Sequence, residues 1–130
     1  MIPPPIRIRT FKDLLVWQKS MDLSIEVYRL TDNYPSHERY GLTAETRKTS
    51  RSVPSNIAEG HKRGSTADYV RFLRIAAGSA GELETQLLPA CRLGYHLEDN
   101  GKAVFALHGE VERMLDALIR RLKAKISSNR

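Results

Sequence analysis

The sequence predicts an all-α protein, an antiparallel up-down four-helix bundle with a proline-kinked second helix. Four segments carry apolar residues at helical spacings, short turn signals separate them, and no segment alternates like a strand. A length of 130 residues leaves room for one core only. We expect residues 1–10 to form an extended arm, residues 11–126 the bundle and residues 127–130 a flexible tail.

The first helix is expected between a proline-rich arm and Tyr34. Three consecutive prolines at residues 3–5 favour polyproline II and forbid a helix start there. Asp13 can cap the helix, and Pro35 ends it because the residue before a proline is pushed out of the α region. Its predicted inner face consists of apolar side chains three and four apart: Leu14, Trp17, Met21, Ile25 and Tyr28.

The second helix is expected from about Ser36 or Gly41 to Gly60, with an inner stripe that is partly threonine: Leu42, Thr46, Thr49, Val53 and Ile57. Pro54 lies well inside it, where a proline costs roughly 3 kcal/mol and kinks the helix. Nearby polar side chains can hydrogen-bond the freed backbone: Ser50, Ser52, Ser55 and Asn56. We predict one kinked helix, with two short helices as the alternative.

The third helix follows a basic turn at residues 61–64 and opens with a capping box at residues 65–68. Gly78 and Gly81 weaken an isolated helix by about 1 kcal/mol each, which suggests close approach of another helix, within the chain or between subunits. Gly94 and residues 98–101 are expected to end the segment. The predicted inner face comprises Tyr69, Phe72, Leu73, Ala76, Ala80, Leu83 and Leu87.

The fourth helix is expected from about Lys102 to Ile126. Its apolar stripe consists of Val104, Leu107, Val111, Met114 or Leu115, Leu118, Leu122 and Ile126. Basic residues crowd its C-terminal end, where the helix dipole favours cations: Arg120, Arg121, Lys123 and Lys125. We interpret this cluster as a dipole complement on a solvated surface.

Composition limits the classes of function. The formal charge of +6 and the pI near 9.7 favour polyanion partners such as nucleic acid. No segment approaches the roughly 20 apolar residues of a membrane span, and the N-terminus lacks the apolar run of a signal peptide. We therefore expect a cytoplasmic protein with no membrane contact. The single cysteine, Cys91, fits a reducing compartment and a packing role.

The sequence contains no recognisable catalytic or metal-binding pattern. We therefore expect that the protein is not an enzyme and that it holds no metal or cofactor. No Glu-x-x-His, His-Glu-x-x-His or phosphate-binding glycine loop occurs. His108 and Glu112 lie one helical turn apart, but two candidate ligands make an incomplete site. Small helical ribonucleases use an arginine and a histidine with four to six residues between them, whereas Arg92 and His96 have three residues between them and Arg51 and His61 have nine.

Basic residues flank the predicted turn between the second and third helices. Arg47 and Arg51 lie one turn apart, as do Arg71 and Arg74, so each pair can present a cationic ridge. Arginine suits phosphate because its planar fork donates two hydrogen bonds at once. Without interleaved aromatics, binding is expected to follow the nucleic-acid backbone. The candidate contacts are Arg47, Lys48, Arg51, Lys62, Arg63, Arg71 and Arg74, and the alternative is a solvated face with local ion pairs.

Five blocks of the sequence resemble one known family. They are residues 13–19 (DLLVWQK), 34–42 (YPSHERYGL), 53–60 (VPSNIAEG), 72–79 (FLRIAAGS) and 82–87 (ELETQL). The resemblance runs from about residue 11 to 125 and is to the four-helix-bundle family of the 23S rRNA intervening-sequence proteins. That family includes the accessory protein of diversity-generating retroelements.

The resemblance implies an up-down bundle that assembles as a ring-like homopentamer with a basic surface or pore. It implies nucleic-acid binding or scaffolding rather than catalysis, and in the retroelement branch a reverse transcriptase as partner. Arg47, Arg63 and Arg74 match basic positions of the family. Asn56, Glu59 and Gly60 match its turn motif, for which we favour a structural role.

The chain departs from the family pattern at two places. Residues 49–51 (TSR) stand where small apolar residues are usual, so Arg51 can extend the cationic ridge or alter a subunit interface. Glu45 stands where an amide is common and works against the ridge. The sequence therefore leaves two functions open, a homo-oligomer that binds nucleic-acid phosphates and a scaffold that binds only proteins.

Overall fold

The computed structural model describes residues 2, 7–96 and 98–128, and it is helical throughout its regular elements. The helices are α1 (Leu15–Thr31), α2 (Leu42–Lys62), α3 (Thr66–Arg92) and α4 (Glu98–Ser128), with short 3-10 helices η1 (Phe11–Asp13) and η2 (Ser36–Glu38). No strand occurs in these ranges, which confirms the all-α prediction. No helix of the described chain has the length and apolarity to cross a membrane.

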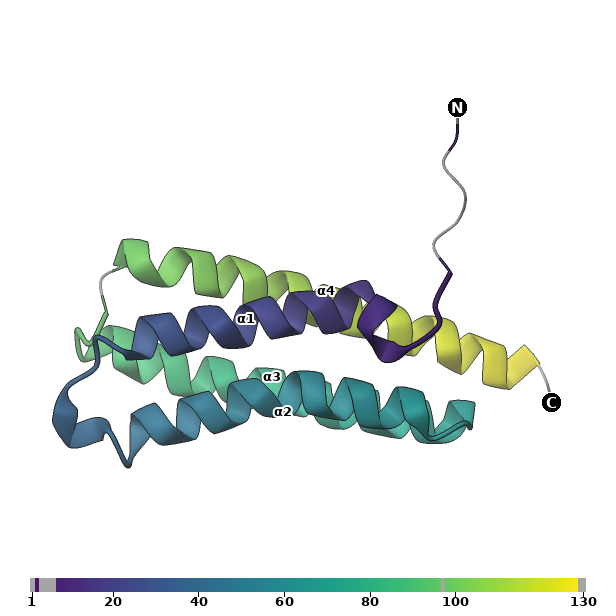
Figure 1. The fold of residues 1–130 in the computed structure, drawn as a ribbon, viewed down its shortest axis with the longest axis horizontal. Coiled ribbons are helices and arrows are strands. Elements are labelled where there is room, and N and C mark those ends of the chain that lie inside the picture. The colour runs from purple at the N-terminus through teal and green to yellow at the C-terminus, as the bar shows by residue number, and fades with distance from the viewer. Residues whose placement is uncertain (1, 3–6, 97, 129–130) are drawn as a thin grey trace.

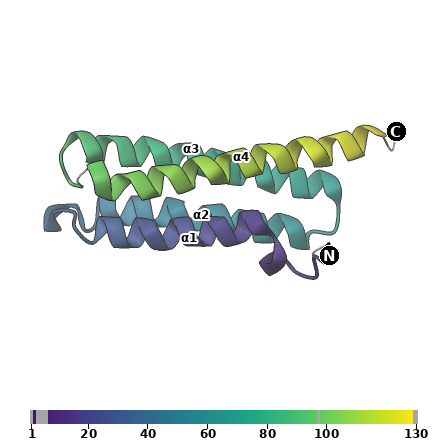
Figure 2. The same ribbon diagram turned by 90° about the horizontal axis from the view of Figure 1, so that it is seen from above.

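Successive helices run in opposite directions and lie side by side in both views (Figures 1 and 2). In the described chain α2 packs against α1 and α3, and α4 packs against the same two helices, so the four form a closed square. The α2–α3 turn and the C-terminus of α4 therefore lie at one end of the bundle (Figure 1). The prolines of the predicted arm lie outside the described residues, and α4 continues through residues 127 and 128 of the predicted tail.

The beginning of α1 differs from the prediction. Asp13 does not cap α1, whose N-cap is Leu14 and carries no side-chain hydrogen bond. Its carboxylate instead accepts from the backbone N–H groups of Arg9 (2.9 Å) and Thr10 (3.1 Å), and Thr10 caps η1 in return. These backbone hydrogen bonds, from Arg9 first, hold the pKa of Asp13 below its usual value. The chain thus makes a capped 3-10 turn before the helix begins.

The inner face of α1 was predicted only in part: Leu14 and Trp17 pack against the core, but the fully buried residues of the helix are others. The buried apolar residues are Val16, Leu23, Val27 and Leu30, whereas Met21 and Ile25 of the predicted face are 38% and 48% exposed. Both sets recur at helical spacings, because α1 carries apolar residues on two faces. The face that enters the core is the one that carries serines. Ser20 and Ser24 are buried there, and their small size permits close helix contact.

Helix α2 continues through Pro54 as a single helix, so the alternative of two short helices is not needed. Three polar side chains donate to nearby backbone carbonyls of the same helix: Ser50 to Arg47 (2.7 Å), Ser52 to Thr49 (2.9 Å) and Asn56 to Ser52 (2.8 Å). None of these three acceptors is the carbonyl that Pro54 deprives of its helical donor, which belongs to Ser50, so the predicted hydrogen bond to the freed carbonyl stays a prediction. The kink itself stays a prediction.

The α2–α3 turn depends on two glycines. A Cβ on Gly60 would lie 2.7 Å from the Cβ of Phe72 and 3.2 Å from the carbonyl oxygen of Tyr69, so α2 approaches α3 too closely for any side chain. Gly64 has a φ of 82°, which favours glycine. Ser65 then caps α3 by accepting from the backbone N–H of Asp68 (3.1 Å), as the capping pattern predicts.

Helix α3 buries most of its predicted inner face, from Phe72 to Leu87. Among the described residues, a Cβ on Gly78 or Gly81 would meet nothing within 4 Å, so the close helix contact within the chain that the sequence suggested is not found at these positions. Contact between subunits stays a prediction. The helix ends at Arg92, before Gly94 with its φ of 76°.

Helix α4 begins at Glu98 rather than near Lys102, so residues 98–101 start this helix instead of ending the previous segment. Acidic residues suit that position because the N-terminus of a helix carries positive partial charge. Val104, Val111 and Leu115 of its predicted stripe are buried in the core, together with His108.

Replacing Gly60 with alanine should destabilise the bundle by roughly 1–3 kcal/mol, because the new methyl group meets backbone and Cβ atoms that cannot move independently. Urea unfolding followed by circular dichroism measures the change. Gly109→Ala on α4 is the matched control, because its added methyl group would meet only the movable end of the Arg113 side chain, and it should alter stability by about 1 kcal/mol at most. Equal effects of the two substitutions would contradict the close approach at Gly60.

Tyr34 should make the bundle sensitive to alkali. Burial, and secondarily the charge of Cys91, raises the pKa of Tyr34 to about 12. Because the folded state disfavours the phenolate, stability is full below the unfolded pKa near 10 and falls as the pH rises to 12, by roughly 2–3 kcal/mol.

Tyr34→Phe should remove that loss and leave stability at neutral pH equal or slightly higher, because the Tyr34 hydroxyl has no hydrogen-bond partner within the described chain. Urea midpoints at pH 8 and pH 11 test this. Tyr40→Phe, at an exposed tyrosine, should leave the pH dependence unchanged.

Candidate nucleic-acid interface

The structure divides the seven candidate phosphate contacts into two groups. Arg47, Lys48 and Arg51 lie along the middle of α2. The other four lie at the end of the bundle that contains the α2–α3 turn: Lys62, Arg63, Arg71 and Arg74.

Arg47 is engaged by α1. Its guanidinium donates to the Thr31 hydroxyl (2.8 Å), the Tyr28 carbonyl (3.2 Å) and the Asp32 carboxylate (2.8 Å). It also lies 4.8 Å from the centre of the Tyr28 ring. Arg47 thus ties α2 to the negative end of the α1 dipole, and its Nε and Nη2 donors are used within the fold.

Arg51 and Lys48 have different surroundings. The Arg51 guanidinium donates to the hydroxyl of Tyr28, the same residue on which Arg47 stacks. Lys48 is exposed in a shallow groove between α2 and α3 that also contains Glu45 and Glu82. Arg47 and Arg51, which the spacing predicted to form a cationic ridge, therefore both contact α1. Lys48 beside them shares its groove with Glu45 and Glu82.

At the bundle end, Arg63 and Arg71 stack on Phe72, with guanidinium carbons 4.8 Å and 4.4 Å from its ring centre. Glu59 pairs with Arg63 (2.8 Å), and Asp68 approaches Arg71 at 3.6 Å. Phe72 is thereby covered and offers no open stacking surface to a base. The two arginines are held in place by the ring and keep further N–H donors at their edges.

The structure adds α4 to this basic end. Lys123 lines a depression with Arg71 and Arg74, on the seam between α3 and α4. Burial raises the pKa of Tyr69, and the positive charge of Arg121 partly opposes the shift, which places Arg121 near the start of α3. The sequence alone indicates a dipole complement on a solvated surface for these α4 residues. The predicted topology could have indicated this proximity, because the fourth helix of an up-down bundle ends beside the turn between the second and third helices.

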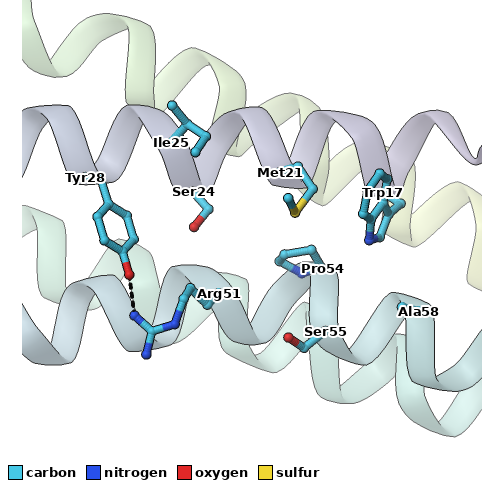
Figure 3. Close-up of a pocket in the computed structure, with 9 residues that line it drawn as sticks. All are labelled: Trp17, Met21, Ser24, Ile25, Tyr28, Arg51, Pro54, Ser55 and Ala58. Carbon is cyan, nitrogen blue, oxygen red and sulfur yellow. Dashed lines mark hydrogen bonds between the residues drawn. The ribbon is translucent and has the colours of Figure 1, made fainter. Parts of the chain in front are cut away.

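A separate apolar groove runs between α1 and α2 (Figure 3). Trp17, Met21, Ile25 and Tyr28 border it from α1, and these residues form most of the inner face that the sequence predicted for that helix. Pro54 and Ala58 border it from α2, and Arg51 lies at one end beside Tyr28 (Figure 3). Monomeric proteins rarely expose extended apolar patches without a function.

The chain was compared with known proteins. The family model for the 23S rRNA-intervening sequence protein matches residues 12–117. A crystal structure of a protein of unknown function from the S23 ribosomal protein family of Bacteroides thetaiotaomicron VPI-5482 superposes with a TM-score of 0.75 at 21% identity. The alignment covers 82% of this chain and 96% of that chain, and at this identity it shows a shared fold. No curated protein matches significantly.

The family match spans the bundle from η1 into the second half of α4, and it contains every candidate phosphate contact on α2 and α3. The blocks from which the resemblance was drawn lie within it, including residues 53–60 around Pro54. The chain therefore belongs to the 23S rRNA-intervening sequence protein family.

Proposed function

We propose that the protein is a non-catalytic homo-oligomer that binds RNA or DNA through phosphate contacts at the basic end of the bundle. This basic end consists of Lys62, Arg63, Arg71, Arg74, Arg121 and Lys123. The observation that carries the proposal is that four of these six make no ion pair within the described residues: Lys62, Arg74, Arg121 and Lys123. Unpaired cations on one surface attract a polyanion and release its counterions.

The contacts would be to the backbone of the nucleic acid. Arginine edges suit phosphate oxygens, and the ring of Phe72 is already occupied by Arg63 and Arg71. Binding is therefore expected to depend weakly on base sequence. The name of the family refers to an intervening sequence of 23S rRNA, which supports RNA as the polyanion.

In this proposal the basic residues in the middle of α2 contribute less to phosphate binding than the basic end does. Arg47 uses its donors on α1, and Lys48 lies near two carboxylates. Arg51 contacts Tyr28 beside the apolar groove, so it is better placed for a protein contact than for phosphate. The proposed phosphate-binding surface therefore lies at the end of the bundle and not along the predicted ridge of Arg47 and Arg51.

Removal of three exposed cations from the basic end should weaken nucleic-acid binding in a salt-dependent way. The triple variant Lys62→Ala, Arg74→Ala, Lys123→Ala should lower the slope of log K against log salt by up to about 3, because each lost phosphate contact removes about 0.9 for duplex DNA. Filter binding of duplex and single-stranded RNA and DNA across a salt series gives this slope.

The matched control removes equal charge near the other end of the bundle, with Arg29→Ala, Arg39→Ala and Arg92→Ala. It should retain most of the slope. Equal losses in both triple variants would show that net charge alone governs binding and would contradict a basic end. If the unaltered chain binds none of these nucleic acids at low salt, the proposal fails.

The homo-oligomer is supported by two apolar surfaces that the fold leaves uncovered. The groove between α1 and α2 is one, and the outer face of α3 is the other, where exposed Ile75 and Leu88 flank the open positions of Gly78 and Gly81. The two surfaces are different, so a second copy that inserts its α3 face into the groove makes a head-to-tail contact. Repeated contacts of this kind close into a ring when the rotation permits. The homopentamer implied by the family is one such ring.

Ile25→Glu should dissociate the oligomer, because it places a charge at the apolar border of the groove. Light scattering coupled to size exclusion measures the mass of the assembly. Leu15→Glu is the control on the same helix, since Leu15 is also exposed but does not border the groove. A chain that is monomeric without substitution would refute the assembly.

The alternative function is a scaffold that binds only proteins, for example a reverse transcriptase. The uncovered groove favours this alternative, because it offers apolar contact and little charge apart from Arg51. Nucleic-acid binding at low salt distinguishes this scaffold from the phosphate-binding homo-oligomer. A scaffold shows no affinity for nucleic acid at low salt while still losing its assembly or partner on Ile25→Glu.

A further inference from the structure

A histidine in the core of the bundle faces two carboxylates in the seam between α3 and α4. His108 on α4 is 1% exposed, and its Nε2 lies 2.6 Å from the carbonyl oxygen of Ala80 on α3. Its other nitrogen, Nδ1, lies 3.4 Å from Oε1 of Glu112 and 3.7 Å from Oε2 of Glu84. One ligand atom from each of these three residues lies within 4.8 Å of the other two.

The contact with Ala80 decides how the imidazole is protonated. A carbonyl oxygen only accepts hydrogen bonds, so Nε2 of His108 carries a proton and donates it. In the neutral ring Nδ1 then bears a lone pair that points toward Glu84 and Glu112. A lone pair facing two negative carboxylates is unfavourable, so this space calls for a positive charge, either a proton on Nδ1 or a metal ion.

The distances favour a metal ion. Hydrogen bonds between a charged donor and a carboxylate measure about 2.7–2.9 Å, and both separations from Nδ1 are longer. Bonds of about 2.0–2.2 Å from a tetrahedral metal hold its ligand atoms roughly 3.4 Å apart. The Nδ1 to Glu112 separation equals this spacing, and Glu84 needs only a small side-chain movement to reach it.

We propose that Glu84, His108 and Glu112 bind a divalent first-row transition-metal ion, with Zn²⁺ as the representative probe. One imidazole and two carboxylates form a three-ligand set that Zn²⁺ accepts, with water in the fourth position. The carboxylates are 46% and 42% exposed, which gives the ion a path from solvent. Mg²⁺ and Ca²⁺ prefer sets made of oxygen alone, so the imidazole disfavours them.

The surroundings of the site match those of metal-binding histidines in general. Such a histidine donates its second N–H to a carbonyl or carboxylate, which fixes its orientation, and the Ala80 carbonyl takes that role. An ion here would join α3 to α4 through side chains of both helices. The sequence contained His108 and Glu112 one turn apart, but the third ligand comes from a different helix and could not be seen. The site lies apart from the basic end and does not depend on nucleic-acid binding.

Calorimetric titration of the full chain with ZnCl₂, after treatment with a chelator, tests the site. We expect saturable binding of one Zn²⁺ per chain and a thermal midpoint that rises with Zn²⁺ concentration. Glu84→Gln and Glu112→Gln should each weaken binding at least tenfold and abolish the rise. Both side chains are partly exposed, so these variants keep the fold, whereas substitution of buried His108 risks unfolding.

Glu82→Gln is the matched control, because it removes an equal charge from α3 outside the cluster. It should bind Zn²⁺ as the unaltered chain does. Co²⁺ provides a second readout, since intense visible absorption indicates a four-coordinate ion, and this absorption should disappear in Glu84→Gln and Glu112→Gln alone. If no stoichiometric binding occurs, or if all three glutamate variants bind equally, the proposal is wrong.

Discussion

The contact between α1 and α2 determines which side of α1 enters the core, and much of the surface depends on that choice. The hydroxyls of Ser24 and Ser50 lie 3.0 Å apart between the two helices, where only small side chains fit. Arg47 secures the same pair by binding Thr31 and Asp32 at the end of α1. With α1 held in this rotation, Val27 enters the core and Met21 remains outside.

The same rotation explains why one part of the predicted cationic ridge does not form. Tyr28 lies between the two helices, with Arg47 against its ring and Arg51 at its hydroxyl. Both arginines therefore stabilise the α1–α2 contact or line its groove. A group of accessible cations forms instead where topology brings the α2–α3 turn close to the basic C-terminal part of α4.

The sequence predicted the fold well because helix periodicity and turn residues are local signals. The inner face of α3 and the cap at Ser65 follow from spacing alone. The face of α1 could not be chosen this way, because Val16 and Trp17 begin two apolar stripes of similar strength. Which face enters the core depends on the contact between the hydroxyls of Ser24 and Ser50, two residues that are 26 positions apart in the sequence. For the same reason the spacing of Arg47 and Arg51 could not show that Tyr28 would engage both.

Buried polar groups in this bundle differ in how completely their hydrogen bonding is satisfied. Ser20 and Thr31 donate to carbonyls of their own helix, and Thr46 does the same in α2. These hydroxyls cost little to bury and allow helices to approach closely. His108 is different, because one nitrogen is bound to α3 while the other faces two carboxylates at distances too long for strong hydrogen bonds. A packing role alone does not require that arrangement, since an apolar side chain would fill the same space without a charge to compensate. The polar core thus contains hydroxyls that determine how the helices fit together and one histidine, His108, whose Nδ1 faces two carboxylates.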